Sequence, residues 1–240
     1  MAFLRAAVIA ALVALISAAA NIVAAEPPHP VFVPAPRGVV MKSQLFYPAG
    51  EGMQSQWRGV LSREFVGKGS SQPFYQYYLS MYQLDGNTYR LRYRSPDNGG
   101  PFSQLAKAHG SELWFPFQNG TIVGAAELMQ PGVQQLVVAS HQTGADCGSA
   151  TVSVFGYDSR TSKVIPEVSV RNGCELSARI IPSAGNNPAS LLLTGPYYNK
   201  DAALCCPTKP RASAMLRYQG GRWIQTPRYY EVSIGKIVRY

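Results

Sequence analysis

The sequence predicts an all-β fold, mainly antiparallel, arranged as a meander, a sandwich or a half-open barrel with few short helices. The chain contains 14 tyrosines, 22 glycines and 18 prolines, a composition that favours short strands joined by tight turns. Alternating segments recur at intervals of roughly ten residues, as they do in sandwiches and barrels. Stripes with the helical period are hard to find, and the best helical candidate, residues 103–108, is short.

The first residues are typical of a secretory signal peptide. A short basic start, MAFLR, precedes the uncharged run AAVIAALVALISAAA, which is too short to span a bilayer comfortably. Val23 and Ala25 stand at the positions where signal peptidase accepts small residues, so we expect cleavage after Ala25. Residues 1–25 are therefore predicted to be a signal peptide, and the protein to be periplasmic or secreted.

A proline-rich stretch follows this leader. The sequence EPPHPVFVPAPR at residues 26–37 contains five prolines, which exclude a helix and a central strand. We interpret residues 26–40 as an extended linker and residues 41–240 as a single β-rich domain. The alternative is two β subdomains divided near residue 130.

The chain is basic, and its charge is uneven. Lys and Arg number 22 and Asp and Glu 13; without Arg5 of the leader the balance is 21 minus 13, or +8. A basic face attracts anionic envelope polymers or lipid surfaces, although scattered cations also simply keep a surface solvated. Another envelope protein is a further candidate partner, and no specific nucleic acid is expected. Eight cations lie in the last 41 residues: Lys200, Lys209, Arg211, Arg217, Arg222, Arg228, Lys236 and Arg239.

The clearest predicted hairpin is FYQYYLSMYQLDGNTYRLRYR, residues 74–94. A turn at Asp85-Gly86 would bring four tyrosines to one side and three arginines to the other. Rings beside cations suit a binding platform for sugars, peptides or single strands; the alternative is that the rings pack on the core beneath solvated arginines. The candidate binding residues are Tyr78, Tyr82, Tyr89, Tyr93, Arg90, Arg92 and Arg94.

Further turns divide the rest of the chain into strands. Asn119-Gly120 predicts a hairpin turn. Gly220-Gly221 separates two basic strands, in the first of which Arg211 and Arg217 share the same parity. The predicted strands are residues 113–117, 121–125, 132–140, 150–158, 163–170, 175–181, 189–195, 211–218 and 222–226.

Four cysteines in an exported chain predict disulfides, and four cysteines permit three pairings. The cysteines are Cys147, Cys174, Cys205 and Cys206. Adjacent residues on a strand point to opposite faces, so Cys205 and Cys206 are also able to reach two different partners.

The run LLLTGPYYNKDAALCCPTKPRASAMLRYQGGRW resembles the C-terminal segment of small exported bacterial β proteins of uncharacterised function, among them some mycobacterial lipoproteins and cyanobacterial secreted proteins. The resemblance covers roughly the last third of the chain, and Cys-Cys-Pro-Thr is its specific part. It implies a Cys205–Cys206 bridge, which leaves Cys147 with Cys174. It implies an exported β module and adds nothing about catalysis, because no activity is established for these proteins.

These patterns predict an exported envelope protein that acts by binding or as a structural module. The alternative is a cell-wall-active enzyme that uses Cys174 or His141, with Asp146 beside the latter to orient an imidazole. No GxSxG, SxxK or HExxH motif accompanies these residues. The sequence predicts no cofactor and no metal site, because Asp-rich calcium loops, phosphate-binding glycine loops and zinc-finger spacing are missing.

Overall fold

The computed structural model describes residues 31–48, 56–68, 73–95, 119–142, 149–185, 187–199 and 207–235. Val31–Tyr240 form one compact unit. The described residues form strands joined by turns and contain no helix, so the all-β, mainly antiparallel prediction is confirmed. The helical candidate at 103–108 and the strand predicted at 113–117 lie outside the described residues.

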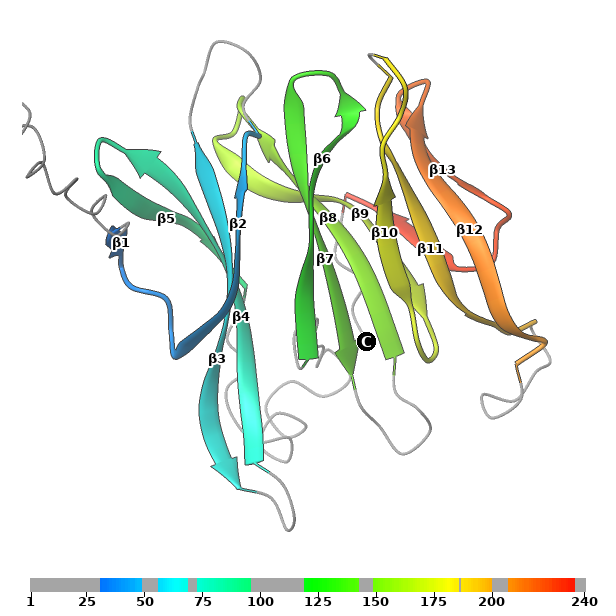
Figure 1. Cartoon of the computed structure of the whole chain (residues 1–240), viewed down its shortest axis with the longest axis horizontal. Helices are drawn as coiled ribbons and strands as arrows, with labels where there is room; N and C mark the ends of the chain where they lie inside the picture. The colour runs from blue at the N-terminus through cyan, green and yellow to red at the C-terminus, as the bar shows by residue number, and fades with distance from the viewer. Residues whose placement is uncertain are drawn as a thin grey trace, which may run out of the picture. The chain divides into compact units, whose positions relative to one another are not determined.

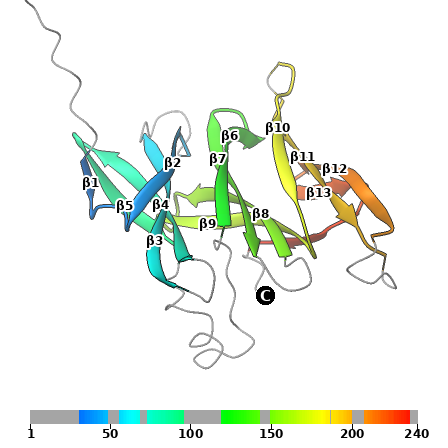
Figure 2. The same cartoon turned by 60° about the horizontal axis from the view of Figure 1, so that its bottom comes forward.

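Three sheets make up this unit, as Figures 1 and 2 show. The N-terminal sheet has the order β1-β5-β4-β3-β2. Its strands are β1 (Val31–Val33), β2 (Val39–Phe46), β3 (Trp57–Lys68), β4 (Pro73–Asp85) and β5 (Thr88–Arg94).

The middle sheet has the order β14-β9-β8-β7-β6, and the C-terminal sheet the order β10-β11-β12-β13. The middle strands are β6 (Asn119–Gln130), β7 (Val133–Gln142), β8 (Ser149–Asp158), β9 (Lys163–Asn172) and β14 (Glu231–Ile234). The C-terminal strands are β10 (Ser177–Ile181), β11 (Ser190–Tyr197), β12 (Lys209–Gln219) and β13 (Arg222–Thr226).

The middle sheet is buried on both faces. On β7, Leu136 and Val138 pack with Trp57 of the N-terminal sheet, whereas Val137 packs with Leu193 of the C-terminal sheet. Successive side chains of a strand point to opposite faces, and both faces here meet another apolar sheet. This explains why the segment reads as a continuous apolar run rather than as an apolar–polar alternation.

The predicted register of the first hairpin is wrong. The turn lies at Gly86-Asn87, with Asp85 opposite Thr88. Farther along, Arg92 is an extra residue in β5 with no partner in β4, which forms a β-bulge. Tyr82 therefore faces Leu91 instead of Tyr89. A β-bulge reverses the face of every residue that follows it, so the one-face assignment fails.

Two other local predictions also need correction. Asn119-Gly120 do not form a turn, because both residues lie in β6 and pair with β7; the hairpin turns instead between Gln130 and Val133. Val31–Val33, inside the predicted linker, form an edge strand that pairs in parallel with β5. An edge position tolerates neighbouring prolines, because only one side of the strand has to donate hydrogen bonds.

A bulge between β8 and β9 places Glu167 in a crowded position. A Cβ atom on Gly156 would meet the Glu167 side chain, which would have to shift to make room for it. Burial raises the pKa of the Glu167 carboxyl, and the nearby charge of Asp158 raises it further. The ionised carboxylate is therefore less stable in the folded chain than in the unfolded chain.

We expect Glu167→Gln to stabilise the protein at neutral pH. A raised acid pKa means that wild-type stability falls as pH rises through that pKa, above the ordinary value of 4.5. The glutamine variant lacks this titration, so its advantage grows from acid to neutral pH. Urea unfolding at pH 4 and pH 7 measures it; an advantage that is equal at both values contradicts the prediction.

Candidate functional site

The outer face of the C-terminal sheet carries four exposed arginines, which we call the arginine face: Arg179, Arg211, Arg217 and Arg222. Along β12, Ala212, Ala214 and Leu216 are buried, so the alternating residues Arg211 and Arg217 point outward. The buried residues pack toward the middle sheet, which fixes the arginines on the solvent side.

The turn between β12 and β13 brings Arg222 to the same face. Gly220 and Gly221 have φ values of 57° and 77°, the backbone that a two-residue hairpin turn needs. Gln219 consequently lies opposite Arg222, and residues directly opposite each other share a face. Gln219 is two residues from Arg217 and therefore lies on the same face of β12. Arg217 and Arg222, on either side of the turn, thus lie on one face.

Arg179 joins this face through the register of the sheet. Arg179 lies opposite Leu192 on β11, and Leu192 lies opposite Met215 on β12, between Arg211 and Arg217. The sequence analysis missed Arg179 because it precedes the basic stretch by more than twenty residues, and only the strand pairing brings it close. The one available signal was local: Arg179 alternates with Ala178 and Ile180 in the segment SARII, which places its side chain on the face opposite to theirs.

Within the part of the chain that the structure describes, the strands of the arginine face carry no counter-charge. The strands β10 to β13 contain no Asp or Glu, and no ion pair of these four arginines is recorded among the described residues. Arg211 and Arg217 are six residues apart, or about 20 Å along a strand. The charge is thus spread over the sheet instead of being focused on one point.

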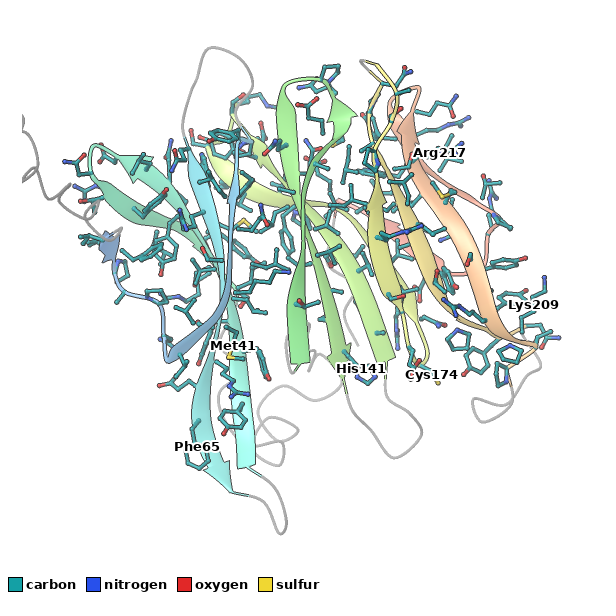
Figure 3. The ribbon with its side chains drawn as sticks, viewed as in Figure 1. Met41, Phe65, His141, Cys174, Lys209 and Arg217 are labelled. Carbon is teal, nitrogen blue, oxygen red and sulfur yellow. The ribbon has the colours of Figure 1, made fainter. Side chains whose placement is uncertain are left out.

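A hollow of about 500 Å³ lies at one end of the face. Met215, Arg217 and Ile181 line it together with the residues that connect β10 and β11. At the other end, the Lys209 ammonium donates a hydrogen bond of 3.0 Å to the Tyr229 hydroxyl, which raises the pKa of Lys209. Figure 3 shows Arg217 and Lys209 near opposite ends of β12.

A second hollow, of about 400 Å³, which we call the edge pocket, lies at β13 and β14. The Gln225 side-chain oxygen accepts hydrogen bonds from the main-chain N–H groups of Tyr229 (2.6 Å) and Tyr230 (2.9 Å), which fixes the loop after β13. Burial raises the pKa of the Tyr230 hydroxyl. The pocket is lined by Arg222, Trp223, Ile224, Gln225, Arg228, Tyr230, Val232 and Ile234.

The tyrosines predicted as a binding platform are core residues. Tyr78, Tyr82 and Tyr89 share the far side of the N-terminal sheet and are 2%, 0% and 3% exposed. Phe32 of β1 packs on two of them, with ring centroids 4.8 Å from Tyr82 and 5.3 Å from Tyr89. Rings buried in this way have no free face for a ligand.

The remaining hairpin candidates divide between the two sides of the sheet. Tyr93 packs on Phe155 of the middle sheet, and burial raises its pKa to about 12. Arg90 pairs with Asp85, and Arg92 donates to Gln83. Arg94 lies on the other side, where it donates to Ser80 and Tyr82. The structure therefore does not bring the seven predicted binding residues together.

The candidate catalytic residues lie near the adjoining ends of the middle and C-terminal sheets. Cys174 is 4% exposed, and the Tyr198 hydroxyl donates to its sulfur at 3.0 Å. His141 lines a hollow of about 300 Å³ with Thr121 and Ser177. Burial leaves the Cys174 sulfur without access for a substrate. Asp146, Cys147, Cys205 and Cys206 lie outside the described residues.

The described residues contain no cluster of side chains able to hold a metal ion. Within the same residues, no helix has the length and apolar character needed to cross a bilayer. Comparison with protein-family models, with curated proteins and with solved structures found no match to this chain.

Proposed function

We propose that this protein is an exported envelope component that binds an anionic polymer through the arginine face. The observation that carries the proposal is a sheet face with four exposed arginines and no carboxylate in any of its strands. The signal-peptide pattern of residues 1–25 supports export. Disulfides among the four cysteines, with Cys147 joined to Cys174, belong to the same proposal.

A polymer fits this face better than a small anion. Single phosphates or carboxylates are bound by donors that converge on one point, whereas these arginines are spread over roughly 20 Å along one strand and over neighbouring strands about 4.8 Å apart. A chain with regularly spaced negative charges contacts several of them at once, and each contact adds to the affinity.

A polymer also fits better than a lipid bilayer. Proteins that sit on membranes combine cations with large apolar side chains that enter the acyl region. Among the described residues, the large exposed apolar side chains are Val31, Val33, Val39, Val40, Met41, Tyr47, Phe65 and Ile234, and none of these lies on the arginine face.

Reversal of Arg211 and Arg217 to Glu should weaken polymer binding at least tenfold. Each cation at a charged surface contributes on the order of 1 kcal/mol, and reversal turns attraction into repulsion. The matched control reverses Arg92 and Arg160, which are exposed outside this face and give the same change in net charge.

The probe is long-chain polyphosphate, titrated by calorimetry into residues 26–240 at 50 and 500 mM salt, with phosphatidylglycerol vesicles as a separate arm. Equal losses in the two double variants would show that only net charge matters. Binding that survives high salt, or that is stronger to vesicles than to polyphosphate, would also contradict the proposal. Circular dichroism confirms that both variants are folded.

A further inference from the structure

Two strand edges that pair with no further described strand, called open edges below, meet at the edge pocket. The first belongs to β13, the last strand of the C-terminal sheet. Gln219 and Arg222 flank the two-residue turn, and in a turn of this type the two flanking residues hydrogen-bond to each other through both main-chain N–H groups. Along the two strands, every second pair of opposite residues is then hydrogen-bonded in this way. Trp223 and Gln225 consequently direct their main-chain N–H and C=O groups away from β12.

The second open edge belongs to β14, the last strand of the middle sheet. The Gly235 N–H donates to the Glu167 carbonyl at 3.0 Å, which fixes the bonded pairs with β9 at alternate residues. Val232 and Ile234 therefore direct their main-chain groups away from β9. All four outward-directed residues, Trp223, Gln225, Val232 and Ile234, line the edge pocket.

The pocket also carries uncompensated positive charge. Arg222 and Arg228 line it, both are exposed, and its lining contains no acidic residue. The Gln225 side-chain nitrogen is buried beside the pocket and has no hydrogen-bond acceptor among the described residues. Because the Gln225 oxygen already accepts two main-chain N–H groups, this nitrogen is fixed as a donor that needs an acceptor.

We propose that the edge pocket binds an extended peptide segment that carries a carboxylate, added as a strand beside β13. A strand edge presents main-chain N–H and C=O groups in alternation, and the main chain of an extended peptide carries the matching donors and acceptors at the same spacing. A sugar or a small anion does not have this regular pattern. The carboxylate pairs with Arg228, and the apolar wall of β14 accepts alternate side chains. A pocket of about 400 Å³ is in the range of ligand sites, about 300–1,000 Å³.

This site overlaps the arginine face at Arg222 alone. Its cation Arg228 follows β13 and does not belong to the face, and its main-chain groups lie along the outer edge of the sheet. A polymer on the face and a peptide at the edge are therefore separable by substitution, even though Arg222 touches both regions.

The probe is a synthetic hexapeptide, acetyl-Ser-Val-Ser-Val-Ser-Asp, with a free C-terminus. Titration followed by amide hydrogen exchange should show saturable binding and at least tenfold slower exchange at the Trp223 and Gln225 amides, because strand addition gives these N–H groups acceptors. Two further peptides, one ending in Asp-amide and one ending in free Asn, distinguish a side-chain carboxylate from a terminal one.

Two matched comparisons make the proposal falsifiable. Arg228→Gln should weaken peptide binding about tenfold or more, since a charge-assisted pair is lost, whereas Arg160→Gln should not. Methylation of the peptide nitrogens at odd positions or at even positions should abolish binding in one series only, because alternate N–H groups face β13.

Equal binding by both methylated series, or unchanged exchange at Trp223 and Gln225 with millimolar peptide, would overturn the proposal. The double reversal of Arg211 and Arg217 should leave peptide binding intact, and Arg228→Gln should leave polyphosphate binding intact. Failure of the peptide site and failure of the polymer site are thereby distinguished.

Discussion

Trp57→Ala should lower the free energy of unfolding by about 3–5 kcal/mol. Trp57 is fully buried, and its ring lies 6.2 Å from Phe46 and 5.0 Å from Tyr157 of the middle sheet, centroid to centroid. Truncation removes apolar contacts from both sheets and leaves a cavity between them. Guanidinium unfolding monitored by circular dichroism measures the loss.

Phe65→Ala is the matched control for this prediction. Phe65 lies on the same strand but is 52% exposed, so its truncation should cost less than about 1 kcal/mol. Figure 3 shows Phe65 near the far end of β3. Similar losses at Trp57 and Phe65 would mean that the N-terminal sheet does not pack on the middle sheet through this face.

Gly195→Ala should lower the free energy of unfolding by at least about 1–3 kcal/mol. A Cβ atom at Gly195 would lie 2.3 Å from the Glu175 carbonyl oxygen, which is main chain and has little freedom to move. The Asn172 amide donates to that same oxygen at 2.7 Å and to the Pro196 carbonyl at 2.9 Å. The extra methyl group therefore disrupts hydrogen bonds as well as packing.

Gly124→Ala provides the comparison. A Cβ atom there would lie 3.0 Å from the end of the Ile180 side chain, which can rotate away. Thermal unfolding of both variants should rank Gly195→Ala below Gly124→Ala. The reverse order would contradict the close main-chain approach at the bulge that follows Gly195 in β11.

The strands from β7 to β13 were predictable because each carries its own local signal, whereas β14 (Glu231–Ile234) was not predicted. Gly220-Gly221 separates two alternating segments, and β12 and β13 lie close to their predicted bounds. The first hairpin was predicted with the wrong register because Gly86 serves two alternative turns equally well, and the extra residue at Arg92 leaves no mark in the alternation. Local patterns define strands but do not reveal a bulge.

The candidate site was predictable only in part. Arg211 and Arg217 share parity within one strand, so the sequence alone places them together. Arg179 and the edge pocket depend on pairings between segments far apart in the chain, and such pairings have no local signature. The tyrosines were misleading for a different reason, because a ring has the same chemistry in a core and in a binding site, and only the packing of Phe32 decides between them.

The pairing of β14 with β9 sets the order in which the chain can be assembled. Ile234 of β14 lies opposite Val168 of β9, and β14 follows all four strands of the C-terminal sheet in the sequence. One edge of β9 therefore has no partner until those strands have been synthesised. Until β14 has formed during synthesis or refolding, β9 presents an unpaired edge able to pair with another chain. A chain shortened before residue 231 keeps every other strand and still fails to close this edge, so such truncations should self-associate.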